Sequence, residues 1–478
     1  MRIAAAIRRH AEAAPDKPAI LAEGRSLTYA GLLRAARDAA AFLDARGVRR
    51  GDRVGVLAEN DPDTLVLLLA CARLGAMLMP LNWRLATPEL EWIVRDAAPR
   101  VLFADAAHGG VLDGALPLGA WPAAEPPNEA PPDPGEGLLL VYTSGTTGRP
   151  KGAVLSGGAL LANAAMSRDM HGLTAADRIL TVIPLFHVGG MNIQTTPALM
   201  CGATVILHRK FDPGATLAAF ARDRPTLTVL VPSTLLAVLE HPAWPGADLS
   251  SLRAVTTGST VVPPSLTRPF VARGVPVLQV YGATESCPIA IYTRLGETWP
   301  EQSTGRPGPL CDARVVDEAG CQLPPGRDGE VLLRGPALFS GYWNNPAETA
   351  AALRDGWFWS GDIGRVDLEG AWFVHDRKKN LIVSGGENIY PAEIERVLGE
   401  HPAVLEAAVI GAPDPRWQEV PVAHVVLRPG AACSEAELKQ HIRGQLARFK
   451  TPRDIRFIDR LPRNAMGKVQ HALLRAAC

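Results

Sequence analysis

The stretch YTSGTTGRPKG, residues 142–152, stands directly after the apolar residues LLLV and indicates the architecture of the whole chain. Its glycines, hydroxyls and lysine include Thr143, Ser144, Gly145, Thr146, Thr147, Gly148 and Lys151. Glycine allows backbone N–H groups to converge on an anion, hydroxyls donate further hydrogen bonds, and lysine adds a positive charge. The stretch therefore predicts a loop that binds the phosphates of a nucleotide.

This loop differs from the Walker A sequence GxxxxGK[ST], because Pro150 precedes the lysine and Gly152 follows it. An ordinary Gly/Ser/Thr surface loop is the plain alternative, but turn chemistry alone seldom produces the whole undecamer. The stretch resembles the phosphate-loop signature of the adenylate-forming superfamily, which contains acyl-CoA synthetases, aryl-CoA ligases and adenylation domains. The resemblance implies that the other parts of that family's site follow in order along the chain.

Composition limits the possible functions. A chain of 478 residues exceeds one ordinary core and predicts two or more domains. Its hydrophobic content of 47% and charged content of 21% are typical of a soluble globular protein. The 49 basic residues balance the 49 acidic residues, so no global field attracts nucleic acid or anionic lipid. Any anion is therefore expected at a local site.

The sequence predicts neither a membrane-spanning segment nor a signal peptide. Residues 65–81 are the longest apolar region, but Arg73 interrupts them and Pro80 lies near their end, so they predict a buried helix and strand. Arg8 and Arg9 break the N-terminal apolar stretch, which argues against a signal peptide. The seven cysteines are odd in number and contain no CxxC pair, which favours a reducing cytoplasm without disulfides or a zinc site.

Alternating helical and extended patterns predict an α/β fold. Residues 29–47 read as an amphipathic helix ended by Gly47, and residues 53–60 as a buried strand. The proline-rich residues 120–137 predict a surface connection into the phosphate loop. Apolar strands then recur with helices between them, and doubly wound sheets of this kind bind ligands at the carboxyl ends of their strands.

The later chain predicts smaller parts. Residues 308–375 contain short strands with Gly, Pro and Asp turns, and a helix near the C-terminus begins with a capping box of Ser434 and Glu437. The expected fold class is α/β: a large N-terminal domain of doubly wound sheets plus a small β-barrel-like part, followed by a small mobile α+β C-terminal domain. The predicted domains are residues 1–378 and 379–478.

YGATES, residues 281–286, follows a strand and joins an aromatic ring, a glycine, a hydroxyl and a carboxylate. Tyr281 is suited to stack on a purine, Thr284 to bond a phosphate oxygen, and Glu285 to bind Mg²⁺. A strand-end turn explains these residues equally well when they are taken alone. The segment resembles the adenine and magnesium motif of the family, which implies that Tyr281 and Gly282 contact the nucleotide.

Asp362 lies between glycines in GWFWSGDIG, residues 356–364, where a lone aspartate is usually a turn former. The segment resembles the ribose-binding motif of the family, and DRKKN follows fourteen residues later. The resemblance implies that Asp362 and Arg377 bind the ribose hydroxyls. Ser259 and Thr260, which follow the strand AVTTG, are further predicted nucleotide contacts.

A hinge and a thiol channel are implied by the next motif. Taken alone, Lys379 belongs to a solvated basic cluster, and SGGENIYPAEIE, residues 384–395, is a turn that leads into a helix. The resemblance implies instead that Lys379 is the hinge between the two domains. It also implies that Ser384, Gly385 and Gly386 line the tunnel for the pantetheine arm of coenzyme A, where glycine allows close approach.

Two further residues complete the implied catalytic set with Thr284 and Lys151. Lys468, in LPRNAMGKVQ, would ordinarily be an exposed lysine near a frayed terminus. By resemblance it is the lysine that enters the active site during adenylation. His187, in PLFHVGGM, is a core or surface histidine by default, and the resemblance implies that it lies against the acyl carboxylate.

The resemblance implies an ATP-dependent acid–CoA ligase. The substrate carboxylate attacks the α-phosphorus of ATP with Mg²⁺ present, pyrophosphate leaves, and the thiol of coenzyme A captures the acyl adenylate. The implied acyl pocket consists of His187, Val188, Met191, Gly258, Gln279, Val280 and Ala283. These residues are mostly small or apolar, so we expect a hydrophobic monocarboxylate, either aromatic, of the benzoate or hydroxycinnamate kind, or a medium-chain fatty acid.

The motifs also bear on other possible functions. The motifs also resemble malonyl-CoA synthetases, but those have arginine at the position of Val280, and a buried second carboxylate without a cation is costly. A stand-alone adenylation enzyme that loads a carrier protein stays open, whereas a non-catalytic nucleotide-binding protein is expected to lack Lys468 or Glu285. The expected partners are a carboxylic acid, ATP and coenzyme A, without nucleic acid or a membrane span. The protein is expected in the cytoplasm as a monomer or a homodimer.

Overall fold

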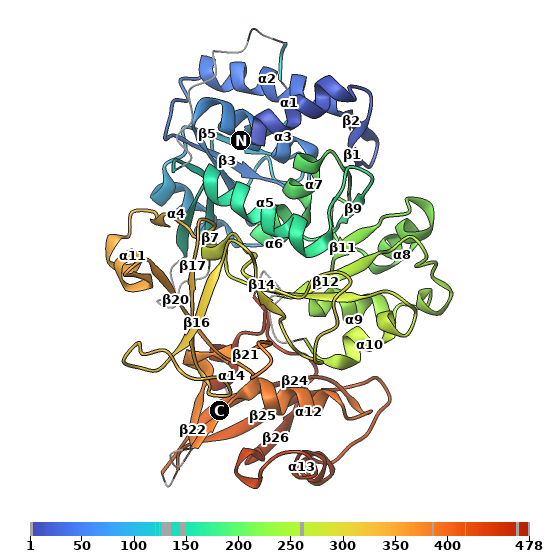
Figure 1. The fold of residues 1–478 in the computed structure, drawn as a ribbon, viewed down its shortest axis with the longest axis vertical. Coiled ribbons are helices and arrows are strands. Elements are labelled where there is room, and N and C mark those ends of the chain that lie inside the picture. Colours follow the sequence, from blue (N-terminus) through green and yellow to red (C-terminus); the bar gives the residue numbers. More distant parts are fainter. Residues whose placement is uncertain are drawn as a thin grey trace.

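A computed structural model describes residues 3–119, 121–123, 125, 135–143, 150–258, 262–384, 387–415, 417–464 and 468–476, without the side chains of residues 379, 387 and 388. In this part of the chain the strands form four sheets (Figure 1). The N-terminal elements lie at one end of the molecule and the C-terminal elements at the other (Figure 1). The expected α/β class with a C-terminal α+β unit is confirmed.

The largest sheet has nine strands, parallel in its centre and antiparallel at its edges. Their order across the sheet is β15 (Arg306–Pro307), β14 (Ile291–Tyr292), β13 (Val277–Tyr281), β12 (Ala254–Gly258), β11 (Leu227–Val229), β9 (Arg178–Thr181), β10 (Thr204–Leu207), β1 (Pro18–Ala22) and β2 (Arg25–Thr28). The parallel strands are short and mostly buried, as expected for strands covered on both faces.

A second sheet of seven strands carries the predicted phosphate loop. Its order is β18 (Gly341–Tyr342), β8 (Lys151–Ser156), β7 (Gly137–Thr143), β4 (Met77–Leu81), β3 (Arg53–Leu57), β5 (Val101–Ala104) and β6 (Leu116–Pro117). Strands β7 and β8 are antiparallel, with Thr143 opposite Lys151 at the end where the loop joins them. The loop that joins these two strands is residues 144–150, of which 144–149 lie outside the described residues.

Helices separate the strands of these sheets. The N-terminal set is α1 (Ile3–Ala13), α2 (Tyr29–Ala45), α3 (Pro62–Leu74), α4 (Thr87–Ala97), α5 (Gly157–His171), α6 (Val188–Gly190), a π-helix η1 (Met191–Thr195), α7 (Thr196–Cys201), α8 (Pro213–Arg222), α9 (Pro232–Glu240), the short η2 (Trp244–Gly246), α10 (Pro264–Val271) and η3 (Thr284–Ser286). The apolar region 65–81 forms most of α3 and all of β4, so the prediction of a buried helix and strand is confirmed. Among the described residues, every helix is too short or too polar to traverse a bilayer.

The region predicted as a small barrel forms an antiparallel sheet of five strands. These are β16 (Asp312–Val316), β17 (Gly329–Arg334), β20 (Trp357–Val366), β19 (Leu353–Arg354) and β21 (Trp372–Arg377), which pairs with β20. Helix α11 (Pro346–Ala352) precedes β19. It starts at Pro346 because Asn345 accepts a hydrogen bond from the Glu348 N–H and proline is favoured in the first turn.

The C-terminal elements have a core of their own. Their strands are β22 (Ile382–Ser384), β23 (Glu387–Ile389), β24 (Val404–Asp414), β25 (Gln418–Leu427) and β26 (Asp454–Phe457), with helices η4 (Lys378–Asn380), α12 (Pro391–Gly399), α13 (Glu435–Arg443), η5 (Arg448–Lys450) and α14 (His471–Ala476). The predicted capping box of α13 is present, since Ser434 and Glu437 bond each other's backbone N–H groups. Two hydrophobic clusters in this part contain only residues beyond 381, including Ile382, Val425 and Leu461.

Candidate active site

The predicted nucleotide residues Tyr281, Asp362 and Arg377 meet in the structure. The Tyr281 hydroxyl donates a hydrogen bond of 2.8 Å to Asp362 Oδ2, and Arg377 Nε lies 2.7 Å from Asp362 Oδ1. Asp362 and Arg377 face each other across β20 and β21, so the sheet register brings them together. Burial raises the pKa of the Asp362 carboxyl, while Arg377 and Tyr281 favour its charged form. The result is an oriented carboxylate beside an aromatic ring.

Local contacts fix the position of Asp362. The backbone N–H of Asp362 donates to Ser360 Oγ at 3.0 Å, and the Ser360 hydroxyl donates to the carbonyl of Val331 at 2.6 Å. Asp362 is only 6% exposed, and the pairing of β20 with β17 and β21 becomes irregular just beside it. Ser360 therefore links the backbone of Asp362 to β17, and Arg377 of β21 holds its carboxylate.

Lys468 comes from the far end of the chain to the same region. Its positive charge helps to stabilise the Asp362 carboxylate, and it also acts on the ring of His187. Two hydrogen bonds between Asn464 and Lys468 hold the backbone of this lysine: the Lys468 N–H donates to Asn464 Oδ1 at 3.0 Å, and the Asn464 N–H donates to the Lys468 carbonyl at 2.8 Å. Lys468 thus lies within electrostatic range of both Asp362 and His187.

His187 is the N-cap residue of α6 and is neutral. The Gly189 N–H donates to His187 Nδ1 at 2.9 Å, so this nitrogen carries no proton. Burial and the nearby charge of Lys468 lower the pKa of His187 to about 3. A neutral imidazole whose Nε2 carries the proton is a hydrogen-bond donor for a substrate oxygen.

Thr284 and Glu285 follow β13 in η3. Thr284 is buried at 7% exposure, and Glu285 Oε1 accepts a 2.7 Å hydrogen bond from the Tyr342 hydroxyl. Among the described residues no three His, Cys, Asp or Glu side chains form a metal cluster, so Glu285 is a single carboxylate. One protein carboxylate together with substrate phosphates is the usual environment of Mg²⁺, and Glu285, which is partly exposed, fits that requirement.

Lys151 is paired within the protein. Its Nζ donates to Glu348 of α11 and lies 5.5 Å from the centre of the Tyr342 ring. Sequence reasoning missed both Tyr342 and Glu348, although the helix start after Asn345 was visible in NPAET. The structure does not place Lys151 beside Asp362, and a phosphate would compete with Glu348 for its charge.

The predicted acyl-pocket residues lie on α6, η1, β12 and β13, except for His187, which precedes α6, and Ala283, which follows β13. Register pairs Gly258 with Val280, so these two residues face the same side of the sheet, whereas Gln279 pairs with Thr257 on the opposite side. A Cβ added to Gly258 would lie 2.2 Å from the Val280 carbonyl oxygen, which explains the glycine. The structure therefore does not bring Gln279 together with Gly258 and Val280. The residues Val188 and Met191 are buried, and Ala283 is partly buried.

Several predicted residues fall outside this description. Ser144, Gly145, Thr146, Thr147, Gly148, Ser259, Thr260, Gly385 and Gly386 lie outside the described residues, as does the side chain of Lys379. Thr143 ends β7 and Ser384 ends β22, and Gly282 is required because an added Cβ would lie 1.8 Å from the Pro288 carbonyl oxygen. The roles of these residues stay predictions.

Comparison with protein families matches residues 7–343 to the AMP-binding enzyme family and residues 393–468 to the C-terminal domain of AMP-binding enzymes. The chain belongs to this family. The prediction that it is an enzyme of the adenylate-forming superfamily, of the acid–CoA ligase type, is confirmed. The boundary at residues 378 and 379 stays a prediction.

Relatives of this AMP-binding enzyme cover almost the whole chain. It is 48% identical to an indoleacetate–CoA ligase of Aromatoleum aromaticum over 98% of this chain and 97% of the relative. It is 42% identical to a feruloyl-CoA synthase of Amycolatopsis over 96% of each chain. The crystal structure of ATP-bound MatB from Rhodopseudomonas palustris is similar, with a TM-score of 0.91, 32% identity and coverage of 100% and 99%.

Proposed function

We propose that this enzyme activates an aromatic monocarboxylic acid with ATP and transfers the acyl group to coenzyme A. The observation that supports this most is the meeting of Tyr281, Asp362 and Arg377 with Lys468 and the neutral His187. A ring with a carboxylate and a guanidinium suits a nucleoside, and a lysine beside a neutral donor suits the reaction of two anions. Nucleotide binding and the joining of the acid to the α-phosphate are therefore proposed to take place at one site.

The first half-reaction joins the acid to AMP. A carboxylate oxygen attacks the α-phosphorus of ATP, an O–P bond forms, and the bond to pyrophosphate breaks with its electron pair leaving on the pyrophosphate. We assign Lys468 and Thr284 to the charge that develops on the phosphate oxygens, and the His187 Nε2–H to the orientation of the carboxylate. Lys151 would exchange Glu348 for a phosphate when ATP binds.

Magnesium is proposed at Glu285. The ion would neutralise charge on the phosphates of ATP and on the departing pyrophosphate. Tyr342 orients the carboxylate of Glu285 through its 2.7 Å hydrogen bond, so it is the residue that prepares this oxygen ligand.

The second half-reaction is proposed to require rotation of residues 379–478 about Lys379. The thiol of coenzyme A loses its proton to solvent, the thiolate sulfur forms a bond to the acyl carbon, and the acyl C–O bond breaks with its electron pair leaving on AMP. Separate hydrophobic cores support such motion, and a cross-boundary ion pair, between Arg428 and Glu240, is largely exposed. Rotation would replace Lys468 with the tunnel proposed at Ser384, Gly385 and Gly386.

An aromatic acid fits the pocket and the relatives better than a diacid. Val280 is 6% exposed and apolar, so a second carboxylate there would have no cation. The relatives named as indoleacetate–CoA ligase and feruloyl-CoA synthase support a ring-bearing acid.

The described cysteines are all free thiols, which supports a cytoplasmic location for the enzyme.

The test measures AMP and pyrophosphate release against a panel of aromatic, aliphatic and dicarboxylic acids, with and without coenzyme A. We expect acid-dependent pyrophosphate exchange without coenzyme A and an aromatic acyl-CoA product with it. Absence of AMP release with every acid would refute the proposal. A product only with a diacid, or only with an added carrier protein, would also contradict it.

A further inference from the structure

Gln194 is a buried polar residue whose amide oxygen is unsatisfied. It lies in the π-helix η1, is 1% exposed, and its Oε1 has no hydrogen-bond partner within the described part of the chain. An unpaired buried acceptor costs free energy, so a native protein that keeps one usually has a use for it. π-helical turns are frequent at functional sites, and this one follows His187 directly after α6.

Hydrogen-bond geometry determines which end of the Gln194 amide is unsatisfied. His171 Nδ1 lies 2.8 Å from the Ser167 carbonyl oxygen, which can only accept, so Nδ1 carries the proton and Nε2 is an acceptor. The Thr256 hydroxyl, 2.9 Å from His171 Nε2, must then donate its hydrogen there. Thr256 Oγ1 can only accept from Gln194, whose Nε2 lies 3.1 Å away. This relay directs the amide NH₂ toward Thr256 and leaves the oxygen as the open group.

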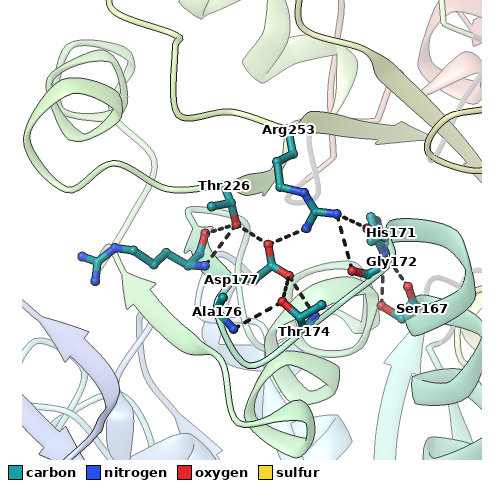
Figure 2. Close-up of polar contacts among 9 residues, drawn as sticks. Ser167, His171, Gly172, Thr174, Ala176, Asp177, Thr226 and Arg253 are labelled. Carbon is teal, nitrogen blue, oxygen red and sulfur yellow. Dashed lines mark hydrogen bonds and ion pairs between the residues drawn. The ribbon is translucent and has the colours of Figure 1, made fainter.

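A charged cluster next to His171 supports the His171 end of this relay (Figure 2). Arg253 donates to the His171 carbonyl at 3.2 Å and to Asp177 Oδ1 at 2.5 Å, and the Thr226 hydroxyl donates to the same Asp177 oxygen at 2.7 Å. These contacts join the end of α5 to the starts of β9, β11 and β12. Burial lowers the pKa of His171 to about 4, so the ring is neutral at physiological pH and the proton positions hold.

Gln194 lies close to residues of the predicted acyl pocket, because it follows Met191 in η1 and its amide bonds Thr256 of β12. Thr256 and Gly258 are two residues apart on β12, so they face the same side of the sheet, together with Val280. At 3.2–3.4 Å per residue, the Gln194 amide lies about 7 Å below the level of Gly258 along the strand. A small cavity beside β9 and β11 is lined by Gln194 and by Gly189, which is close to His187 in the chain.

We infer that Gln194 Oε1 is the specificity group that accepts a hydrogen bond from a ring N–H or O–H at the end of the acid farthest from its carboxylate. The inference rests on the proposed function and narrows its substrate class to aromatic acids with a distal donor. The carboxylate lies near His187, the ring passes Gly258 and Val280, and the donor meets the open oxygen. Apolar walls with one placed acceptor are typical of such pockets. Thr257 has an unpaired oxygen too, but it faces the opposite side of the sheet.

The experiment compares acids that differ only in the donor. Indole-3-acetate is paired with benzothiophene-3-acetate, and 4-hydroxycinnamate with cinnamate, so that the two pairs separate a ring N–H from a phenolic O–H. The readout is kcat/KM for acid-dependent ATP–pyrophosphate exchange. In the wild-type enzyme we expect one donor acid to exceed its matched partner by roughly 10- to 100-fold, because a site built for a hydrogen bond discriminates against the analogue that lacks it.

Gln194→Met removes the acceptor at similar volume. We expect the ratio within the preferred pair to fall to about 1–3-fold, with kcat/KM for the acid without a donor retained or raised. If Gln194 had only a structural role, kcat/KM would fall by the same factor for both acids and their ratio would not change; that result would overturn the inference. Gln440→Met, the same change at an exposed position of α13, is the control and should leave kcat/KM unchanged for both acids.

Thr256 provides a second test that leaves Gln194 in place. Thr256→Val removes the hydroxyl that orients the amide and should lower the donor preference, whereas Thr256→Ser keeps the hydroxyl and should preserve it. Equal ratios in these two variants would contradict the relay. A wild-type enzyme that uses aliphatic acids but neither aromatic pair would overturn this inference and leave acid–CoA ligase activity intact.

Discussion

Tyr281 donates a 2.8 Å hydrogen bond to Asp362, 81 positions further along the chain, and this bond joins the end of β13 to the small antiparallel sheet. The ring and the carboxylate belong to two motifs that have no local connection. Their contact forms a corner in which Arg377 supplies the opposite charge. The first prediction concerns this corner.

Asp362→Asn should weaken ATP binding selectively. The change removes the charge that pairs with Arg377 and the best acceptor for ribose hydroxyls, so we expect the KM for ATP to rise roughly 10- to 100-fold with little change in the KM for the acid. Steady-state kinetics with each substrate varied will measure this. Glu369→Gln, at an exposed turn of the same sheet, is the control. An unchanged KM for ATP would exclude a ribose role.

Lys468→Ala should separate the two half-reactions. We expect pyrophosphate exchange to fall by roughly 10²- to 10³-fold, since a charge that stabilises the transition state is lost. Thioester formation from supplied acyl adenylate should be largely retained. Lys210→Ala, at an exposed lysine, serves as the control. Equal loss of both half-reactions would contradict the assignment of Lys468 to adenylation.

Lys379→Pro should stall the second half-reaction. Proline fixes φ near −65° and would restrict backbone rotation at the predicted hinge. Adenylation should continue while acyl-CoA formation falls, as measured by single-turnover assays of each step. Lys379→Ala keeps the backbone free and should behave nearly as wild type. Normal overall turnover in the proline variant would show that the hinge lies elsewhere.

Glu285→Gln should raise the Mg²⁺ concentration needed for half-maximal adenylation. A neutral amide is a weaker ligand for a hard cation than a carboxylate. Titration of the initial rate with Mg²⁺ will measure the shift. Tyr342→Phe, which removes only the hydrogen bond to Glu285 Oε1, should give a smaller shift in the same direction. Identical Mg²⁺ dependence in all three proteins would rule out a metal role for Glu285.

Because of His171, the free energy of unfolding should be lower in mild acid than at neutral pH. Its pKa is lowered from 6.5 to about 4 by burial, so the unfolded chain binds the additional proton between these pH values. The free energy of unfolding therefore falls as pH decreases through this window, by about 2 kcal/mol at pH 5 from this residue alone. Denaturant unfolding at pH 7.5 and pH 5 will measure it.

The variant His171→Gln isolates that contribution from the other histidines. It is expected to be less stable at pH 7.5, because it disturbs the bonds to Ser167 and Thr256. Its stability should nevertheless depend less on pH than that of the wild type between pH 6.5 and 4. Parallel curves for the two proteins would show that His171 does not titrate in this window.

Local features of the fold were predictable because they depend on neighbouring residues. The capping box of Ser434 and Glu437 and the helix and strand of residues 65–81 follow from spacing and hydrophobicity alone. The motif at residues 142–152 also indicated the family correctly. These elements need no knowledge of what packs against them.

The site was predictable only as separate parts. The pairing of Lys151 with Glu348 and the neutrality of His187 depend on segments that meet after folding. Gln194 gave no signal in MNIQT, because a buried glutamine becomes informative only when its partners and its unpaired atom are known.

The amino-acid sequence by itself determined the family, the succession of chemical groups and the α/β class, because these depend on residue type and short-range spacing. The tertiary structure alone decided which groups share a space: Asp362 with Tyr281, Lys468 with His187, and Gln194 with Thr256. The physical reason is that sheet register and loop closure set distances between remote positions, and these distances decide burial, proton position and charge.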